Sequence, residues 1–145
     1  MKIAVLQGAN LNRLGRRNPA KYGHTTLAEI TADLDRTAAD LGVDLAHAQS
    51  NSEAALVDFV HENQDEWHGI VINPAGFSAA GYPLLDAVRD TELHYAVVHI
   101  SQWHAIDAKE RTDIFAGTAT VYVAGAGWRG YSMALDAIVH KLRND

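Results

Sequence analysis

The chain has no cysteine among its 145 residues. Disulfide bonds, thiolate metal sites and cysteine nucleophiles are therefore excluded. It also lacks any run of the roughly 20 apolar residues that a membrane-spanning helix requires, and its short apolar start does not match the core of a secretion signal. Basic residues number 12 against 18 acidic ones, and the net charge of −6 argues against a nucleic-acid partner. We expect a soluble, cytoplasmic protein that binds neither nucleic acid nor a membrane.

Apolar runs and helical patterns alternate along the whole chain. The apolar share of 48% and charged share of 21% are ordinary for a globular protein, and the length suits a single domain, residues 1–145. Apolar runs predict strands at residues 2–7, 43–48, 69–73, 95–101 and 118–124, with helices between them and a closing helix at residues 128–143. This alternation predicts an α/β fold, a flavodoxin-like three-layer sandwich whose five-stranded parallel sheet has the order 2-1-3-4-5.

Three local signals mark where helices begin. Residues 26–29 and 50–53 each have the spacing of a capping box, with a Thr or Ser three places before a Glu. Pro83 fits only the first turn of the helix after strand three. Residues 102–117 are polar and irregular, and we expect one short helical piece there, at about residues 107–112.

Polar residues stand where the predicted strands end. Asn10, Asn51 and Asn73 follow the first three strands, and His99 and Ser101 close the fourth. The carboxyl ends of parallel strands share one edge, where ligands bind in sheets of this kind. We therefore expect these side chains to converge on one site. Each also has a structural interpretation, because Asn often forms turns and a histidine at a strand end is often only part of the packing.

The connection over residues 8–23 is unusually long. Such connections in compact α/β units usually have about 2 to 6 residues. Two interpretations are open: a slack, mobile loop, or a lid that carries Asn10, Arg17 and Tyr22 over a pocket.

Tyr22 and Arg17 suggest what such a lid could do. A tyrosine is a poor base at neutral pH, but a guanidinium within about 4–6 Å favours its phenolate form. A phenolate can take a proton from a carbon next to a carbonyl. The alternative is a tyrosine that packs at the edge of the loop with its hydroxyl in water.

Residues 125–130 match the Gly-x-Gly-x-x-Gly pattern of dinucleotide-binding turns. Only 15 residues follow, with no further strand and no acidic residue placed to hold a ribose, so a tight turn with close helix packing is the better interpretation. His99 and His104 share no face and have no carboxylate at a ligand spacing. We therefore expect neither a dinucleotide site nor a metal site.

Taken together, these motifs resemble the type II 3-dehydroquinate dehydratase (dehydroquinase) family, over nearly the whole chain. They lie at residues 7–17, 22–23, 49–53, 73–74, 99–101 and 125–131. The resemblance implies a flavodoxin-like protomer, usually assembled as a dodecamer of trimers, that acts on a small keto acid without a cofactor.

The resemblance also implies catalytic roles. Tyr22 is expected to be the base, and Arg17 the cation that holds it as a phenolate. Asn10 is expected to hold a water that stabilises the enolate, and His99 to protonate the departing hydroxyl.

The same resemblance implies a set of substrate-binding residues. Asn73 and the backbone amides of Ile100 and Ser101 are expected to bind the substrate carboxylate. Asp86 is retained among the substrate-binding positions, and Arg111 is the candidate to replace a missing arginine.

The chain departs from the family pattern around the far hydroxyls of the ring. Ala79 stands in place of a histidine, and Val97 in place of a glutamate that orients and charges the catalytic histidine. Ile106 and Glu110 occupy two arginine positions, and Arg111 lies one place beyond the second.

Two functions are consistent with this pattern. The first is a dehydratase that eliminates water from 3-dehydroquinate or, because of the lost contacts, from a related keto acid with a different distal end. The second is a non-catalytic or carboxylate-binding oligomeric relative, which Val97 and the missing arginine favour. The intact pair of Arg17 and Tyr22 argues for the enzyme, because a binding module has no need of an activated phenol.

Overall fold

The computed structural model describes residues 1–106 and 111–145 and contains one parallel sheet. Its strands are β1 (Lys2–Ala9), β2 (Asp44–Gln49), β3 (Gly69–Ala75), β4 (Tyr95–His99) and β5 (Val121–Ala124). Their order is β2-β1-β3-β4-β5, as the sequence predicted. Gln7 pairs with Gln49 on one side and with Asn73 on the other, so the ends of the first three strands meet at one edge.

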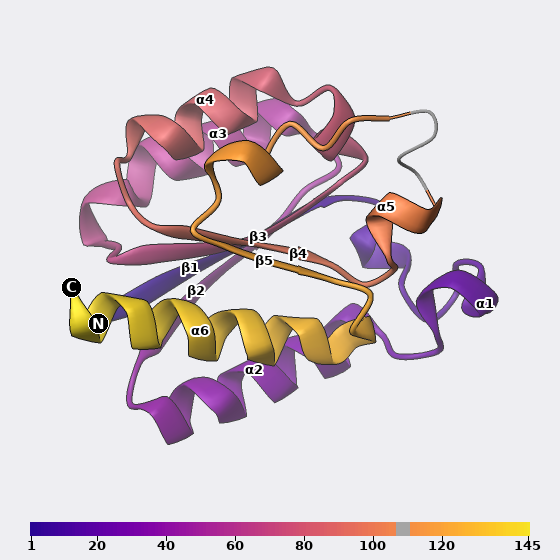
Figure 1. Ribbon diagram of the computed structural model, residues 1–145, viewed down its shortest axis with the longest axis horizontal. Helices are drawn as coiled ribbons and strands as arrows, with labels where there is room; N and C mark the ends of the chain where they lie inside the picture. The colour runs from indigo at the N-terminus through magenta and orange to yellow at the C-terminus, as the bar shows by residue number, and fades with distance from the viewer. Residues whose placement is uncertain (107–110) are drawn as a thin grey trace.

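Two pairs of helices cover the two faces of the sheet (Figure 1). Helices α2 (Leu27–Leu41) and α6 (Gly130–Asn144) pack on one face, and α3 (Glu53–Asn63) and α4 (Tyr82–Asp90) on the other. The central strands are apolar on both faces because each face is covered by helices. The expected three-layer sandwich is therefore confirmed. No helix in the described ranges has the length and apolar character needed to cross a membrane.

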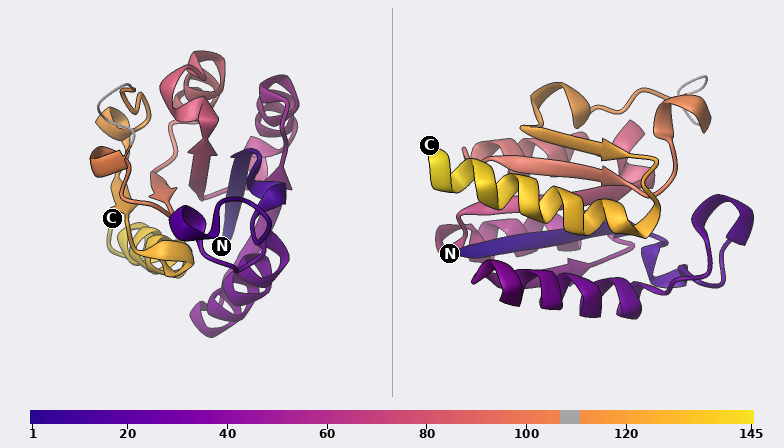
Figure 2. Two further views of the ribbon diagram at one scale, coloured as in Figure 1. Left: turned by 90° about the vertical axis from the view of Figure 1, so that its right-hand side faces the viewer. Right: turned by 60° about the horizontal axis from the view of Figure 1, so that its bottom comes forward.

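Short helical turns fill the connections. They are η1 (Leu11–Arg13), α1 (Pro19–Tyr22), η2 (Gln64–Glu66), η3 (Gly76–Ala79), α5 (Trp103–Ile106), η4 (Ala116–Thr118) and η5 (Gly127–Arg129). Of these, α1 and α5 lie at the end of the molecule opposite the two termini, and the left view of Figure 2 faces that end. The helical piece expected at 107–112 falls mainly on residues 107–110, which lie outside the described residues.

The two predicted capping boxes had different outcomes. Thr26 caps α2 as predicted: its hydroxyl accepts from the Glu29 amide, and the Glu29 carboxylate accepts from the Thr26 amide. The second box was wrong, because Ser52 caps α3 and the Ser50 hydroxyl accepts instead from the Ser52 amide. The Glu53 carboxylate is directed away from its own helix start and accepts from an amide in the first turn of α4 at 3.1 Å.

The glycine-rich segment after β5 is a tight turn, as expected. Gly125 and Gly127 have φ values of 85° and 63°, which are unfavourable for residues with a Cβ atom. A Cβ on Gly130 would lie 3.3 Å from the Val123 side chain, so this glycine allows α6 to pack closely on the sheet.

Candidate active site

A cavity of about 570 Å³ opens at the carboxyl ends of the strands. Eight of the predicted site residues line it: Asn10, Arg17, Tyr22, Asn73, His99, Ile100, Ser101 and Arg111. They come from the connection after β1, from the ends of β3 and β4, and from the segment between β4 and β5, so the expected convergence at this edge is observed. Asp86 is not brought to this cavity; it lies exposed on α4.

Asn10 stands at a constrained point where β1 leaves the sheet. Its backbone is left-handed, with φ 68°, a conformation that asparagine tolerates better than most residues. Its amide donates to Asn51 Oδ1 at 2.8 Å, and Gln49 Nε2 donates to the same oxygen at 3.2 Å. The end of β2 therefore fixes the start of the long connection.

Tyr22 and Arg17 meet over the cavity. The Arg17 guanidinium lies 4.4 Å from the centre of the Tyr22 ring, and its Nη2 donates to the Tyr22 hydroxyl at 3.4 Å. That distance is long for a hydrogen bond, so much of the contact is the stacking of cation on ring. The Lys21 ammonium lies 5.3 Å from the same ring. Two cationic side chains therefore lie against this ring.

Asn73 is held rigidly by a buried network. Its Oδ1 accepts from the Ala75 amide at 3.1 Å, and its Nδ2 donates to the Tyr131 hydroxyl at 2.8 Å. That hydroxyl donates in turn to Gln7 Oε1 at 2.6 Å. Burial raises the pKa of Tyr131, against a smaller lowering effect from Asn73, so this hydroxyl keeps its proton. Ala75 has an unusual φ of 50°, a local strain of the kind found at functional sites.

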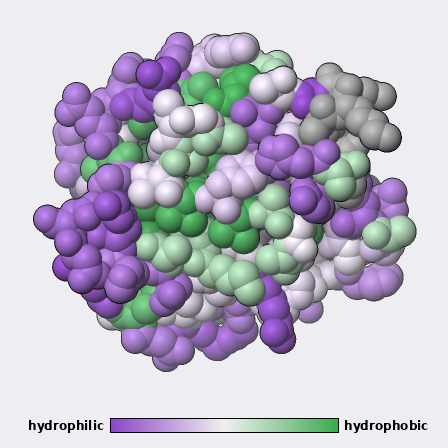
Figure 3. Space-filling view, in the orientation of Figure 1, coloured by the Kyte–Doolittle hydropathy of each residue, from purple (hydrophilic) through white to green (hydrophobic). Residues whose placement is uncertain are grey.

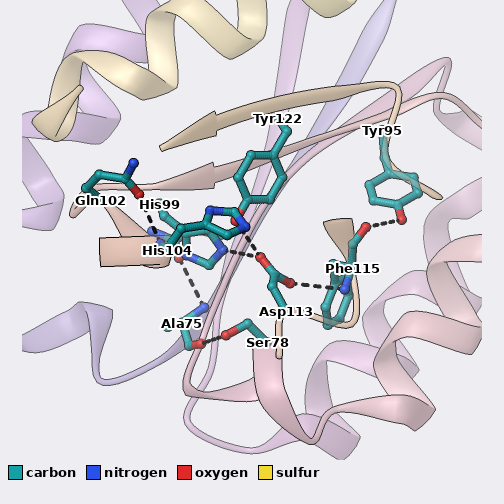
Figure 4. Close-up of polar contacts among 10 residues, drawn as sticks. Ala75, Ser78, Tyr95, His99, Gln102, His104, Asp113, Phe115 and Tyr122 are labelled. Atoms are coloured by element: carbon teal, nitrogen blue, oxygen red, sulfur yellow. Dashed lines mark hydrogen bonds and ion pairs between the residues drawn. The ribbon is translucent and has the colours of Figure 1, made fainter. Parts of the chain in front are cut away.

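Sequence reasoning missed the partner of His99. The imidazole Nε2 lies 2.6 Å from Asp113 Oδ2, and both side chains are buried, with 5% and 2% of their surface exposed (Figure 4). Burial alone would raise the pKa of the Asp113 carboxyl, but hydrogen bonds and charge from His99, with the Tyr122 hydroxyl and the Phe115 amide, hold it below its usual value. No sequence pattern signalled this pair, because 14 residues separate the two positions.

Three of the positions that depart from the family pattern, or that compensate for a departure, can be located in the structure. Ala79 lines the cavity together with Ala75, Gly76 and Ala80, so this wall carries small side chains. Val97 is fully buried in the sheet. The side chain of Ile106 and all of Glu110 lie outside the described residues. Arg111 faces the cavity, as required of a replacement for the missing arginine.

The described residues offer no cluster of metal-binding side chains. Within residues 1–106 and 111–145, no three His, Cys, Asp or Glu side chains come close enough together to hold a metal ion. The polar side chains that line the cavity are cations, amides, hydroxyls and one imidazole, with no carboxylate among the described residues, which suits an anionic organic ligand.

Comparisons with known proteins agree with this geometry. Residues 1–139 match the family described as dehydroquinase class II. The chain is 41% identical to a 3-dehydroquinate dehydratase of Pseudoalteromonas translucida over 99% of its length and 95% of that protein's. It is 43% identical to the protein of the same name from Jannaschia sp., over 99% and 97%.

Solved structures give the same result. A type II dehydroquinase from Propionibacterium acnes superposes with a TM-score of 0.89 at 34% identity, covering 96% of each chain. A 3-dehydroquinate dehydratase-like protein from Bifidobacterium longum gives a TM-score of 0.70 at 29% identity, covering 100% of this chain and 99% of that one. The chain belongs to the class II dehydroquinase family, as its motifs predicted.

Proposed function

We propose that this protein is a hydro-lyase that eliminates water from 3-dehydroquinate through an enolate intermediate. The observation that carries the proposal is the meeting of Tyr22, Arg17, Asn73 and His99 on one cavity, in a chain of this family. The reaction needs a base, a proton donor and a carboxylate site, and the cavity supplies a residue for each.

The elimination divides into two proton transfers. The Tyr22 phenolate takes a proton from the carbon next to the ketone, and the electrons of that C–H bond move into an enolate. A water held by Asn10 stabilises the enolate oxygen. As the enolate collapses, the C–O bond of the neighbouring carbon breaks, and the departing oxygen takes a proton from His99. The products are a conjugated enone and water, so no electrons are gained or lost and no redox cofactor is required.

Substrate binding uses the other side of the cavity. Asn73 and the backbone amides of Ile100 and Ser101 hold the substrate carboxylate in this proposal. The backbone there is fixed to the glycine-rich turn, because the amides of Gly127 and Gly125 donate to the carbonyls of Ile100 and Ser101 at 3.1 Å each. Arg111 adds positive charge to the cavity.

The wall around Ala79 bears on the choice of substrate. It offers small, apolar side chains to the distal part of a bound ring. A hydroxyl placed there without a partner would lose about 1–3 kcal/mol of binding free energy. A keto acid with a less polar distal end is therefore the second candidate substrate for the same chemistry.

The non-catalytic alternative loses its main support. It was favoured by Val97, which leaves His99 without the usual glutamate, and by the missing arginine. A buried carboxylate, Asp113, lies against that imidazole, and Arg111 lines the cavity. The relatives that carry an enzyme name span nearly the whole chain.

The test is turnover of 3-dehydroquinate, followed by the absorbance of the conjugated enone. We expect Tyr22→Phe, which keeps the ring but removes the hydroxyl, to lower kcat by about 10²–10⁴-fold. The control is Tyr82→Phe, because Tyr82 is 59% exposed on α4. Failure of the wild type to turn over any keto acid, or an unchanged rate in Tyr22→Phe, would refute the proposed function.

We infer a homo-oligomer, a dodecamer of trimers, acting in the cytoplasm and in the shikimate pathway. In support, Figure 3 shows apolar surface gathered across the face where the edge strand β5 lies. Asp86 lies away from the cavity, so a substrate contact by this residue would have to be made in a neighbouring copy. Light scattering, which gives the mass of the assembly, tests the dodecamer; a monomeric mass would contradict it.

A further inference from the structure

The imidazole of His99 is enclosed on several sides. The Trp103 ring of α5 stacks on it, with centroids 4.7 Å apart and planes 26° apart. The Tyr122 ring of β5 lies 5.7 Å away at a tilt of 54°. The Asp113 carboxylate lies at the edge of the ring and contacts Nε2. The second ring nitrogen, Nδ1, therefore remains for a ligand in the cavity that His99 lines.

Asp113 is itself fixed by two further donors. The Tyr122 hydroxyl donates to its Oδ2 at 2.9 Å, and the Phe115 amide donates to its Oδ1 at 3.0 Å. Figure 4 shows the carboxylate between these groups and His99. A buried carboxylate with three donors is held both in position and in its ionised form. It therefore presents a fixed negative charge to the edge of the imidazole.

We propose that Asp113 is the positioning residue of His99: it holds Nε2 protonated and stabilises the imidazolium from which Nδ1 gives a proton to the departing hydroxyl. The inference rests on the proposed function for the identity of the proton acceptor. During the step, the Nδ1–H bond breaks and an O–H bond forms on the departing oxygen. The electron pair of the broken C–O bond stays with that oxygen, His99 becomes neutral, and Asp113 remains a carboxylate.

The other described side chains that pack around His99 supply no negative charge. Val97, two residues before His99 on the same face of β4, is buried and uncharged. The Tyr122 hydroxyl donates a hydrogen bond to the carboxylate, and burial and Asp113 raise the pKa of this tyrosine, so it stays neutral. The His104 ring packs against the edge of Tyr122, with centroids 5.7 Å apart. Among the described residues that pack on His99, Asp113 is the acidic one.

A purely structural role for Asp113 is the competing explanation, because it also ties the chain at Phe115. Asp113→Asn separates the two. The asparagine Oδ1 can still accept from the Phe115 amide, while its Nδ2 would present a donor to Nε2 and favour the neutral ring protonated on Nδ1. Asp113→Glu keeps the charge and is the rescue variant. Asp58→Asn, which neutralises an exposed acid on α3, is the matched control.

The first measurement is steady-state turnover of 3-dehydroquinate by the full chain at pH values from 5.5 to 9. We expect kcat of Asp113→Asn to fall about ten- to hundredfold, with KM changed less than threefold, and its activity to decline at a lower pH than that of the wild type as pH rises. Asp113→Glu should recover at least part of kcat. Equal damage by Asn and Glu, in proportion to a lowered unfolding temperature, would overturn the proposal in favour of a structural role.

The second measurement does not depend on turnover. Long-range ¹H–¹⁵N correlation spectra of the histidine rings report which nitrogen carries the proton. We expect His99 to be protonated on Nε2 in the wild type and to lose that signature in Asp113→Asn but not in Asp58→Asn. Unchanged His99 signals would overturn the proposal even in an active enzyme. If the wild type fails to turn over 3-dehydroquinate but shows the expected signals, the proposed function fails and the pairing of Asp113 with His99 stands.

Discussion

Arg17 makes two contacts with Tyr22, one with the ring and one with the hydroxyl. The planar guanidinium can do both because it stacks on aromatic faces and carries donors at its edge. A lysine ammonium at the same position is a compact charge and cannot reproduce this geometry. The geometry of this contact is therefore specific to arginine, whereas its positive charge could also come from a lysine.

We expect Arg17→Lys to lower kcat at neutral pH at least tenfold, because the charge is kept but the stacked donor is lost. Steady-state kinetics with the enone assay measures this effect. Arg16→Lys is the matched control, since Arg16 is the exposed neighbour in the same connection and does not line the cavity. Equal rates in the two variants would show that any nearby cation is sufficient.

At the scale of elements, the close approach of β1 and β3 places the site residues. A Cβ on Gly8 would lie 2.1 Å from the Pro74 carbonyl oxygen, far inside the normal contact distance. Only glycine therefore lets the two strand ends lie side by side, with Asn10 following one and Asn73 in the other. The middle of the connection also lies close against the start of α2, because a Cβ on Gly15 would lie 2.9 Å from the side chain of Thr26, the cap of that helix.

Gly8→Ala should lower the free energy of unfolding by about 1–3 kcal/mol, or more if the strands cannot separate. It should also lower kcat, because the end of β1 would move relative to Asn73. Urea denaturation and the enone assay measure the two effects. Gly117→Ala is the control, because a Cβ there meets nothing within 4 Å. A Gly8→Ala protein as stable and active as this control would contradict the argument.

At the scale of the whole molecule, buried ionisable groups link folding to pH, and Asp113 and Tyr131 act at opposite ends of the pH range. The Asp113 carboxyl, whose pKa burial would raise, has its pKa held below the usual value by His99, Tyr122 and Phe115. Its contribution to stability is present above about pH 4 and is lost as the pH falls through the folded value. The pKa of Tyr131 is raised by burial, so its contribution is present below about pH 10 and is lost as the pH rises further.

We therefore expect the free energy of unfolding to be nearly constant from about pH 5 to pH 9 and to decline on both sides. Asp113→Asn should flatten the decline on the acid side, and Tyr131→Phe the decline on the alkaline side. Urea denaturation at a series of pH values measures both slopes. Slopes that are the same in the variants and the wild type would show that other groups control the pH dependence.

The sequence by itself determined the fold and most of the lining of the cavity. Strand and helix periods depend on residues close together in the chain, and so does the capping box at Thr26, so these features can be found by inspection. The positions of Asn10, Asn73 and His99 followed from where the strands end. The prediction that Ser50 caps α3 was wrong: Ser50 has the capping-box spacing to Glu53, but Ser52 is the cap, and serine is favoured as a cap with or without the box.

Only the tertiary structure decided how the site residues are supported. Asp113 reaches His99 across an irregular segment, and Tyr131 joins Gln7 to Asn73 from the far end of the chain. Such contacts depend on how distant segments pack, and no local period encodes them. The sequence showed the lost glutamate at Val97, whereas the fold supplied the carboxylate that lies against the histidine.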